Sequence, residues 1–361
     1  MTMTAGRSRM GRLAAIGFVS LLLVGGCDGD GDDDQPPAPP PVPTGFNQAR
    51  GFSGPVDLIA LAADGTGDVY VAGGFLTYNS TRRDRIARFN ADETLDLGFA
   101  VGSGFTNTVW SITPAGDGSG DIYVRGDFTS YNGTATNYIV RLNYDGTVDA
   151  GFAVGSGFNS GVNSIATAGD GSGDIYVGGN FTSYNGTATN YIVRLNSDGA
   201  VDAGFTIGSG FNSIVWPITP AEDGSGDIYV GGYFTSYNGA ATDYIVRLNS
   251  DGTLDADFAI GSGFNTSVWS ITPAEDGSGD IYVGGFFTSY NGTATNFIAR
   301  LNSDGTLDAG FGVGFGFNNW VRSIAPAGDG SGDIYVGGGF TSYDTTTVDR
   351  LTRLGAGGGV E

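Results

Sequence analysis

One nine-residue stretch, GSGDIYVGG, returns at a fixed interval along this chain. It stands whole at 171–179, 224–232, 277–285 and 330–338, and close variants stand at 65–73 and 118–126. The aspartates of these stretches are 53 residues apart at every step: Asp68, Asp121, Asp174, Asp227, Asp280 and Asp333. A fixed period near fifty residues indicates a propeller or a solenoid, in which each repeat is one small supersecondary unit.

Each repeat divides into four short strands separated by turn signals. In the fifth repeat, Val268–Ala274, Asp280–Phe287 and Phe297–Asn302 read as three strands, and Leu307–Phe317 carries the fourth. The Asp-Gly and Asn-Gly turns between them favour antiparallel hairpins. Four antiparallel strands in about fifty residues are typical of one propeller blade, whereas a β-helix rung is about half as long. We therefore predict an all-β, six-bladed β-propeller with 53-residue blades of four antiparallel strands.

The phase of the repeat bears on how the ring closes. The first residues in phase, Gly45 and Phe46, fall in the fourth-strand position, and the last predicted strand, Leu351–Leu354, is a third strand. An N-terminal strand can then pair with the last three strands and remove an exposed sheet edge. We predict a propeller over residues 46–361 whose ring is closed by the N-terminal strand.

The repeated stretch solves one packing problem in every blade. GSGD makes a tight turn in which glycine supplies a positive φ. DIYV is apolar enough to be buried on both faces between neighbouring blades. The double glycine marks a place where two backbones approach closely and a side chain would clash.

Several patterns recur together in register: DIYVGG.F, RLN.DGT.D and a downstream phenylalanine. Together they resemble the bacterial delta-60 repeat, a β-propeller family of uncharacterised function, and the double glycine resembles kelch repeats. The resemblance covers Phe46 to about Leu354. It implies a propeller and implies no activity.

The N-terminal residues have the pattern of an export signal. Three arginines precede the apolar stretch Leu13–Val24, which is too short to span a bilayer as a helix. Gly25 and Gly26 directly before Cys27 resemble a bacterial lipobox, so we predict a lipoprotein signal peptide over 1–26 and a lipidated Cys27. The alternative is an ordinary signal peptide with a chance cysteine. Residues 27–45, acidic and proline-rich, read as a tether. The expected location is the bacterial cell envelope, periplasmic or on the outer surface, with the membrane contacted through the lipid alone.

Composition excludes several function classes. The formal net charge is −22, so the basic footprint that a nucleic-acid partner requires is missing. The chain has no histidine, which excludes a Ser-His-Asp triad and histidine-based metal sites. A carboxylate pair for glycoside hydrolysis is less favoured but stays open. We predict that the protein is not an enzyme.

Charged residues of the repeat have structural interpretations. Six arginines share one phase, and we expect each to pair with aspartates equivalent to Asp145 and Asp149; they are Arg88, Arg141, Arg194, Arg247, Arg300 and Arg353. The DGSGD turns place two aspartates four residues apart, as at Asp117 and Asp121. Calcium on such turns is an alternative to a plain capped turn. The prediction is no cofactor and no metal site.

Positions that differ between blades point to a ligand site. Packing demands the same residue in each blade, so a varying position is released from packing or recruited for binding. Three series vary at the ends of the first and second strands: Asp57, Trp110, Asn163, Trp216, Trp269, Arg322; Pro55, Thr108, Gly161, Ile214, Ser267, Trp320; and Gly74, Asp127, Asn180, Tyr233, Phe286, Gly339. Antiparallel topology places them on one face, around the mouth of the central channel.

We predict a ligand-binding platform from this set: Trp110, Trp216, Trp269, Trp320, Arg322, Tyr233, Phe286, Asp127 and Asn163. Exposed aromatic rings suit sugar stacking or a protein partner. The alternative is that the large residues only fill space at the ends of the blades and have no role in binding. The favoured function is a lipid-anchored scaffolding module that binds envelope proteins, and the alternative function is a lectin-like module that binds polysaccharide.

Overall fold

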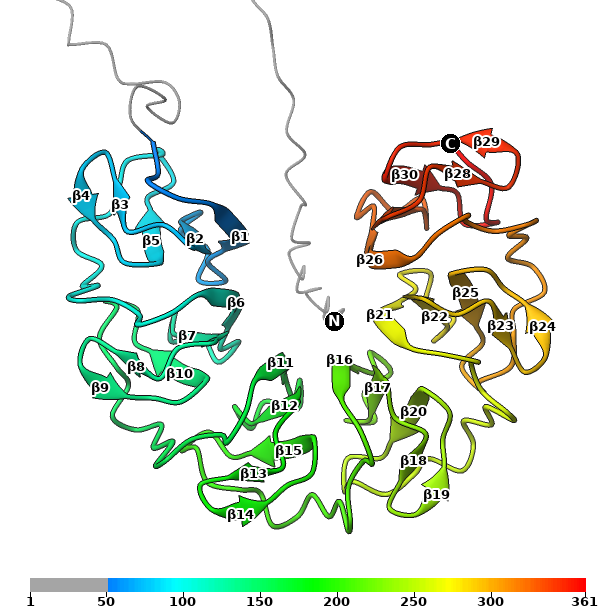
Figure 1. Cartoon of the computed structure of the whole chain (residues 1–361), viewed down its shortest axis with the longest axis horizontal. Helices are drawn as coiled ribbons and strands as arrows, with labels where there is room; N and C mark the ends of the chain where they lie inside the picture. Colours follow the sequence, from blue (N-terminus) through cyan, green and yellow to red (C-terminus); the bar gives the residue numbers. More distant parts are fainter. Residues whose placement is uncertain (1–50) are drawn as a thin grey trace, which may run out of the picture.

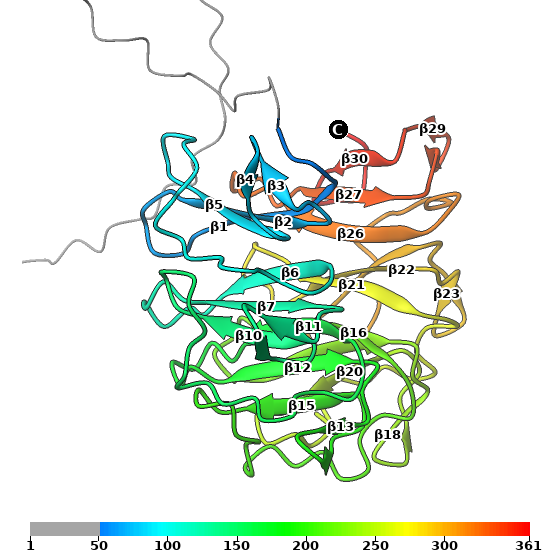
Figure 2. The same cartoon turned by 60° about the vertical axis from the view of Figure 1, so that its left-hand side comes forward.

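The computed structural model describes residues 51–361, and these residues contain only β structure. Six three-stranded antiparallel sheets follow one another along an arc (Figure 1). We number them blades 1–6 from the N-terminal side. The turned view shows the same order, from β1–β5 in blade 1 to β26–β30 in blade 6 (Figure 2). The described residues therefore form a six-bladed β-propeller, as the repeat predicted.

Every blade is built from the same three strands. The inner strand lines the concave side of the arc, the middle strand pairs with it, and the outer strand follows (Figure 1). The inner strands are β1 (Val56–Leu61), β6 (Val109–Pro114), β11 (Val162–Thr167), β16 (Val215–Pro220), β21 (Val268–Pro273) and β26 (Val321–Pro326). The middle strands are β2 (Val69–Gly73), β7 (Ile122–Gly126), β12 (Ile175–Gly179), β17 (Ile228–Gly232), β22 (Ile281–Gly285) and β27 (Ile334–Gly338). The outer strands are β5 (Ile86–Phe89), β10 (Ile139–Leu142), β15 (Ile192–Leu195), β20 (Ile245–Leu248), β25 (Ile298–Leu301) and β30 (Leu351–Leu354).

The loop between middle and outer strands is itself a short hairpin in every blade. Its two-residue strands are β3 (Thr77–Tyr78) and β4 (Thr81–Arg82), β8 (Ser130–Tyr131) and β9 (Thr134–Ala135), β13 (Ser183–Tyr184) and β14 (Thr187–Ala188), β18 (Ser236–Tyr237) and β19 (Ala240–Ala241), β23 (Ser289–Tyr290) and β24 (Thr293–Ala294), and β28 (Ser342–Tyr343) and β29 (Thr346–Thr347). The sequence had indicated only a loop there.

The fourth strand of each blade is short. In blade 5, Leu307 forms a bridge with Leu301, but the rest of the expected strand 307–317 continues as turns. The cause is Asp308, whose Oδ1 accepts a hydrogen bond from the Gly310 backbone N–H at 2.7 Å. This local bond competes with strand pairing and turns the chain toward the next blade.

The predicted closure by an N-terminal strand is not found in the described residues. Residues 45–50 lie outside them, and Phe52 pairs with Tyr78 of blade 1 itself. The place beside β30 is held by Val360, which bridges Leu354. The glycine-rich end of the chain thus supplies its own fourth strand, with Gly358 at φ 88° where blade 5 has Gly305 at φ 84°. The sequence alone did not predict this strand, because Gly357–Gly359 stands where blade 5 has the turn Asp304-Gly305-Thr306.

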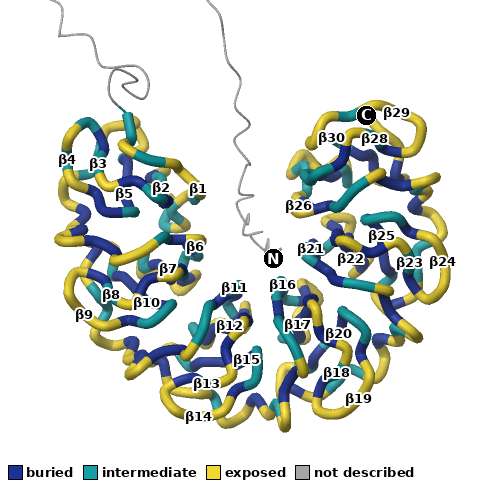
Figure 3. Tube along the Cα trace, viewed as in Figure 1, coloured by how far each residue is buried: buried dark blue, intermediate teal, exposed yellow. Residues whose placement is uncertain are grey.

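The core lies between neighbouring blades. Each main cluster combines two blades, as where Tyr229 and Ile245 of blade 4 join Val268 and Ile271 of blade 5. Buried residues fill the sheets, whereas exposed residues follow the outer hairpins (Figure 3). The second glycine of the pair has the predicted role, since a Cβ on Gly232 would lie 2.2 Å from the Ile214 carbonyl oxygen. The first glycine instead leaves room for side chains, since a Cβ on Gly231 would lie 2.6 Å from Val268 Cγ1 of the next blade.

The two end blades expose the surfaces that the other blades bury against each other. Inner strands contact their neighbours from β1 and β6 through to β21 and β26, and no comparable contact joins β1 to β26. Ile59 is 68% exposed, but its equivalent Ile271 is 6% exposed. Tyr335 is 43% exposed, against 2% for Tyr282. Residues 51–361 therefore form an open arc.

The predicted signal peptide, Cys27 and the tether lie outside the described residues. Within residues 51–361, no helix has the length and apolar character needed to cross a membrane.

Candidate ligand-binding face

The varying position of each inner strand is a β-bulge. Val268 pairs with Gly285 and Ser270 with Gly284, so Trp269 between them has no partner in the middle strand. The same irregularity follows the first valine of the other inner strands, and in blade 4 it takes in both Trp216 and Pro217. A bulge frees a residue from the ladder and re-aims its side chain. These residues therefore vary because sheet pairing does not constrain them.

Three blades bring four aromatic side chains together at this end of the sheets. The Trp269 ring lies 5.9 Å from the rings of Trp216, Phe286 and Trp320, measured between centroids. Trp216 meets it edge-on at 87°, and Phe286 stacks on it at 21°. We call Trp216, Trp269, Phe286 and Trp320 the aromatic cluster. It joins blades 4, 5 and 6 at the end of the sheets where their inner strands begin.

The cluster is only partly buried. Phe286 is 48% exposed, and the three tryptophans are half-buried. Trp320 covers Gly339, where a Cβ would come within 2.4 Å of the indole. Blade 6 therefore needs a glycine at the position where blade 5 has Phe286, which explains why the two series vary together.

Polar groups accompany the aromatic cluster. The guanidinium carbon of Arg322 lies 5.4 Å from the centroid of Trp269, within the range of a cation–π contact. Trp269 Nε1 is buried without a hydrogen-bond acceptor among the described residues. Tyr233 is 53% exposed and stands 6.1 Å from Tyr244, a ring that the sequence had not singled out.

The remaining predicted residues lie apart from the aromatic cluster. Trp110 in blade 2 is 47% exposed and makes no ring contact within residues 51–361. Asp127 is exposed in the same blade. Asn163 donates hydrogen bonds to Asn180 Oδ1 at 2.9 Å and to the Val215 carbonyl at 3.0 Å, so it joins blades 3 and 4. Of the predicted set, Trp110, Asp127 and Asn163 therefore lie outside the aromatic cluster, in blades 2 and 3.

Five stretches of the chain match the model of a β-propeller described as a domain of unknown function (DUF5122). They are residues 63–99, 118–152, 171–205, 224–258 and 277–311. The repeats are those of a β-propeller family. No curated protein matches the chain.

Solved propellers resemble this one at low identity. The WD40 β-propeller domain of Doa1 is 14% identical, with a TM-score of 0.39 over 84% of this chain and 93% of that chain. A GH74 enzyme of Niastella koreensis is also 14% identical, with a TM-score of 0.49 over 83% of this chain and 45% of that chain. These likenesses say nothing of what this propeller binds.

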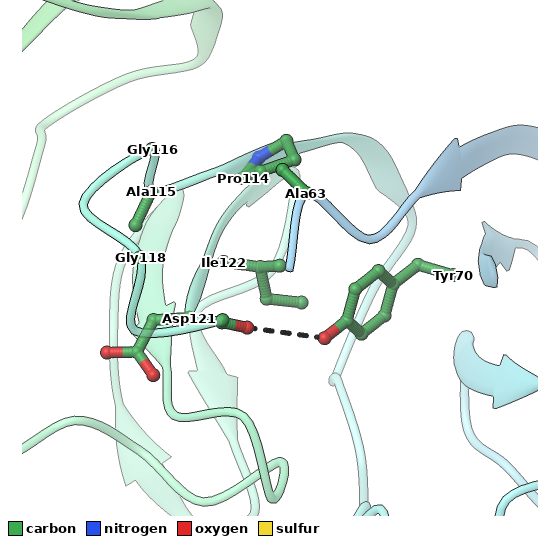
Figure 4. Close-up of a pocket in the computed structure, with 9 residues that line it drawn as sticks. Ala63, Tyr70, Pro114, Ala115, Gly116, Gly118, Asp121 and Ile122 are labelled. Carbon is green, nitrogen blue, oxygen red and sulfur yellow. Dashed lines mark hydrogen bonds between the residues drawn. The ribbon is translucent and has the colours of Figure 1, made fainter. Parts of the chain in front are cut away.

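Hollows of the propeller lie on the other face, beside the turns between inner and middle strands. One between blades 4 and 5 has a volume of about 470 Å³ and is lined by Tyr229 and the turn 274–279. Between blades 1 and 2, the Tyr70 hydroxyl donates to the Gly120 carbonyl at 3.5 Å (Figure 4). The same bond recurs from Tyr123 to Gly173 and from Tyr176 to Gly226. We interpret these hollows as products of repeated blade packing.

The repeated arginines of the propeller are held by aspartates, as predicted. Arg141 Nε lies 3.2 Å from Asp149 Oδ2. Asp145, the other expected partner, instead accepts from the Thr147 N–H at 2.9 Å. The DGSGD turn supplies partners that the sequence analysis missed, because Arg141 Nη2 lies 2.6 Å from Asp117 Oδ2 and 2.9 Å from Asp121 Oδ2. Residues 51–361 contain no cluster of three or more acidic, histidine or cysteine side chains placed to hold a metal ion.

Proposed function

We propose that this propeller is a binding and scaffolding module of the bacterial cell envelope, attached to the membrane through a lipid on Cys27. It acts without chemistry of its own, and its ligand face is the end of the sheets that carries the aromatic cluster. The ligand is an envelope protein or an envelope polysaccharide.

One observation carries the proposal: the contact of Trp269 with three further aromatic rings at a β-bulge. Sheet pairing does not require these residues, since other blades place Asp57 or Asn163 at the same position. Large half-exposed rings near one another are enriched in binding surfaces, where they give contact area at low entropic cost. The six blades repeat one sequence pattern and differ mainly at these positions. The residues that distinguish one blade from another therefore lie on this face.

The lipid anchor rests on the apolar leader and on the place of Cys27 after Gly25 and Gly26. Replacing Cys27 by serine removes the only thiol available for acylation. We expect Cys27→Ser to shift the protein from the membrane fraction to the soluble fraction, or to leave it unprocessed at its full mass. Fractionation and intact mass measure this, and Cys27→Ala serves as a second variant. A parent protein without acyl mass would contradict the anchor.

A lectin-like function is the second candidate, and one observation favours it. Tyr233 and Phe286 hold the same position in neighbouring blades and are 53% and 48% exposed. Rings repeated from blade to blade suit the repeated rings of a polysaccharide. A glycan array probed with the purified protein separates this candidate from a protein scaffold. A reducing-end assay on the same glycans tests for hydrolysis, which we expect not to occur.

Trp269→Ala tests the ligand face. Because burial of an indole against a ligand contributes roughly 1–3 kcal/mol, we expect about tenfold weaker binding or more to any glycan that the array identifies. Leu254, on the fourth strand of blade 4, offers a control of ordinary packing through Leu254→Ala. The melting temperature is measured for both variants. If Trp269→Ala lowers the melting temperature and leaves affinity unchanged, the tryptophans only plug the blades.

A further inference from the structure

Blade 6 ends the arc with the face that earlier blades use to receive the next blade. In blade 5, a Cβ on Gly284 would lie 2.6 Å from Val321 Cγ1 and 3.1 Å from Ile324 Cδ1 of blade 6. Blade 6 keeps this glycine as Gly337, but a Cβ there would meet only the Arg350 carbonyl oxygen, at 3.8 Å. The hollow that receives a valine and an isoleucine is therefore present on blade 6, and no described residue fills it.

Blade 1 begins the arc with the matching side chains. Counted in steps of 53 residues round a ring of six blades, Val321 and Ile324 correspond to Val56 and Ile59 of blade 1. Both are exposed, as is the neighbouring Leu61. The terminal units of a repeat protein need a polar outer face to remain soluble. The two end faces of this arc are apolar instead, which indicates that a partner covers them.

A hydrogen-bonding group of blade 6 also finds its counterpart on blade 1. The middle-strand tyrosine of one blade donates from its hydroxyl to a glycine carbonyl of the next, as from Tyr282 to Gly332 at 3.4 Å. The next pair in this series is Tyr335 of blade 6 with Gly67 of blade 1. Tyr335 is exposed, and its hydroxyl has no such acceptor among the described residues. The two end faces therefore match in polar as well as apolar groups.

Opposite charges stand at the bulge position of the two end blades. Bulge residues of neighbouring blades contact each other: the Trp216 and Trp269 rings lie 5.9 Å apart, and the Arg322 guanidinium carbon lies 5.4 Å from the Trp269 centroid. The bulge residue that follows Arg322 round the ring is Asp57 of blade 1. Both are exposed, and neither forms an ion pair within residues 51–361. The end faces are thus complementary in charge too.

We propose that blade 6 docks on blade 1 of the same chain through these faces, which closes the arc, and that Arg322 and Asp57 pair at the junction. Two complete blades meet face to face, so the contact needs no strand from residues 45–50. The end blades stand on either side of one opening (Figure 1), and the chain that links them keeps each at a high effective concentration for the other. Closure continues the ligand face from the aromatic cluster into blade 1, and it does not depend on what that face binds.

Two matched truncations test the docking without any ligand. Ile59 is 68% exposed in the open arc, whereas Ile271 at the same position of blade 5 is 6% exposed. If the faces dock, Ile59→Ala removes a buried side chain just as Ile271→Ala does. We expect Ile59→Ala to lower the melting temperature of the full-length protein by at least about half as much as Ile271→Ala. An unchanged melting temperature in Ile59→Ala would overturn the inference.

A disulfide across the junction identifies what covers each face. A Cβ on Gly284 would lie 3.3 Å from Val321 Cβ, close to the separation found across a disulfide. The corresponding pair at the junction is Gly337→Cys with Val56→Cys, made in Cys27→Ala so that no other thiol is present. We expect mild oxidation to consume both thiols within a monomer. Gly284→Cys with Val321→Cys is the matched control inside a described interface.

The oxidation has three outcomes. A monomer without free thiols supports the docking. A disulfide-linked dimer would show that a second copy covers the end face, and free thiols beside an oxidised control would show that the arc stays open. Either of the last two results overturns the inference. The proposed function is tested separately, because none of these measurements involves a ligand.

Charge reversal tests the ion pair at the junction. Asp57→Arg in the junction cysteine pair places two cations together, so we expect slower oxidation than without it. Arg322→Asp added to the same chain restores opposite charges and should restore the rate. If Asp57→Arg leaves the rate unchanged, the pairing of Arg322 with Asp57 is wrong.

Discussion

Replacing Arg300 by methionine is expected to lower the free energy of unfolding by about 3–5 kcal/mol. The side chain of Arg300 is 9% exposed and holds three carboxylates. Nη2 lies 2.9 Å from Asp280 Oδ2, and Nε lies 3.3 Å from Asp308 Oδ2. Asp276 completes the group through Nη2. Without the guanidinium, three negative charges stay close together with no cation between them.

Two arginines whose side chains are more exposed than that of Arg300 provide the matched controls. Arg353 has two equivalent aspartate partners, but its side chain is 31% exposed, so Arg353→Met should cost less than Arg300→Met. Arg350 is 68% exposed and pairs only with Asp349, so Arg350→Met should cost about 0–1 kcal/mol. Urea unfolding of the three variants gives the ranking. Equal losses at Arg300 and Arg350 would show that the buried network adds nothing.

Acid dependence gives a second measurement of the same network. A hydrogen bond from Ser278 and the charge of Arg300 lower the pKa of Asp276 to about 2, against an ordinary value of 3.8. Since the folded pKa is depressed, the stabilisation is fully present above about pH 4 and is lost as the pH falls toward 2. Arg300→Met removes one of these causes. The difference in stability between parent and variant should therefore stay constant from pH 7 to about pH 4 and shrink as the pH falls further toward 2.

Much of this fold could be predicted from the amino-acid sequence, because every blade repeats the same residues to form the same packing between blades. The period of 53 residues, the buried DIYV strand and the double glycine appear in the structure as expected. Arg141 and Asp149 were also paired correctly, since both hold one phase of the repeat and lie near each other in the chain. Asp117 was missed as a partner because it lies 24 residues from Arg141, and only the register of β7 against β10 brings the two together.

The sequence predicted which types of residue form the candidate site, but it did not predict which of them contact one another. Differences between blades identified Trp216, Trp269 and Trp320, because repeats reveal which positions packing does not fix. They could not show that Trp110 stands apart, since separation around an arc depends on blade rotation rather than on sequence distance.

Replacing Gly285 by alanine is expected to destabilise the propeller by roughly 3 kcal/mol, at the upper end of what one added methyl group costs in a packed core. A Cβ there would lie 2.3 Å from the Ser267 carbonyl oxygen and 2.9 Å from Phe287 Cδ1. The carbonyl belongs to backbone at the edge of the β21–β22 pair, so it cannot rotate away as a flexible side chain could. The matched control is Gly161→Ala, where a Cβ would meet nothing within 4 Å, and we expect it to change stability by less than about 0.5 kcal/mol. Thermal and urea unfolding measure both variants. If Gly285→Ala unfolds at the same urea concentration as the parent, close backbone approach does not explain why every blade keeps a glycine at this position.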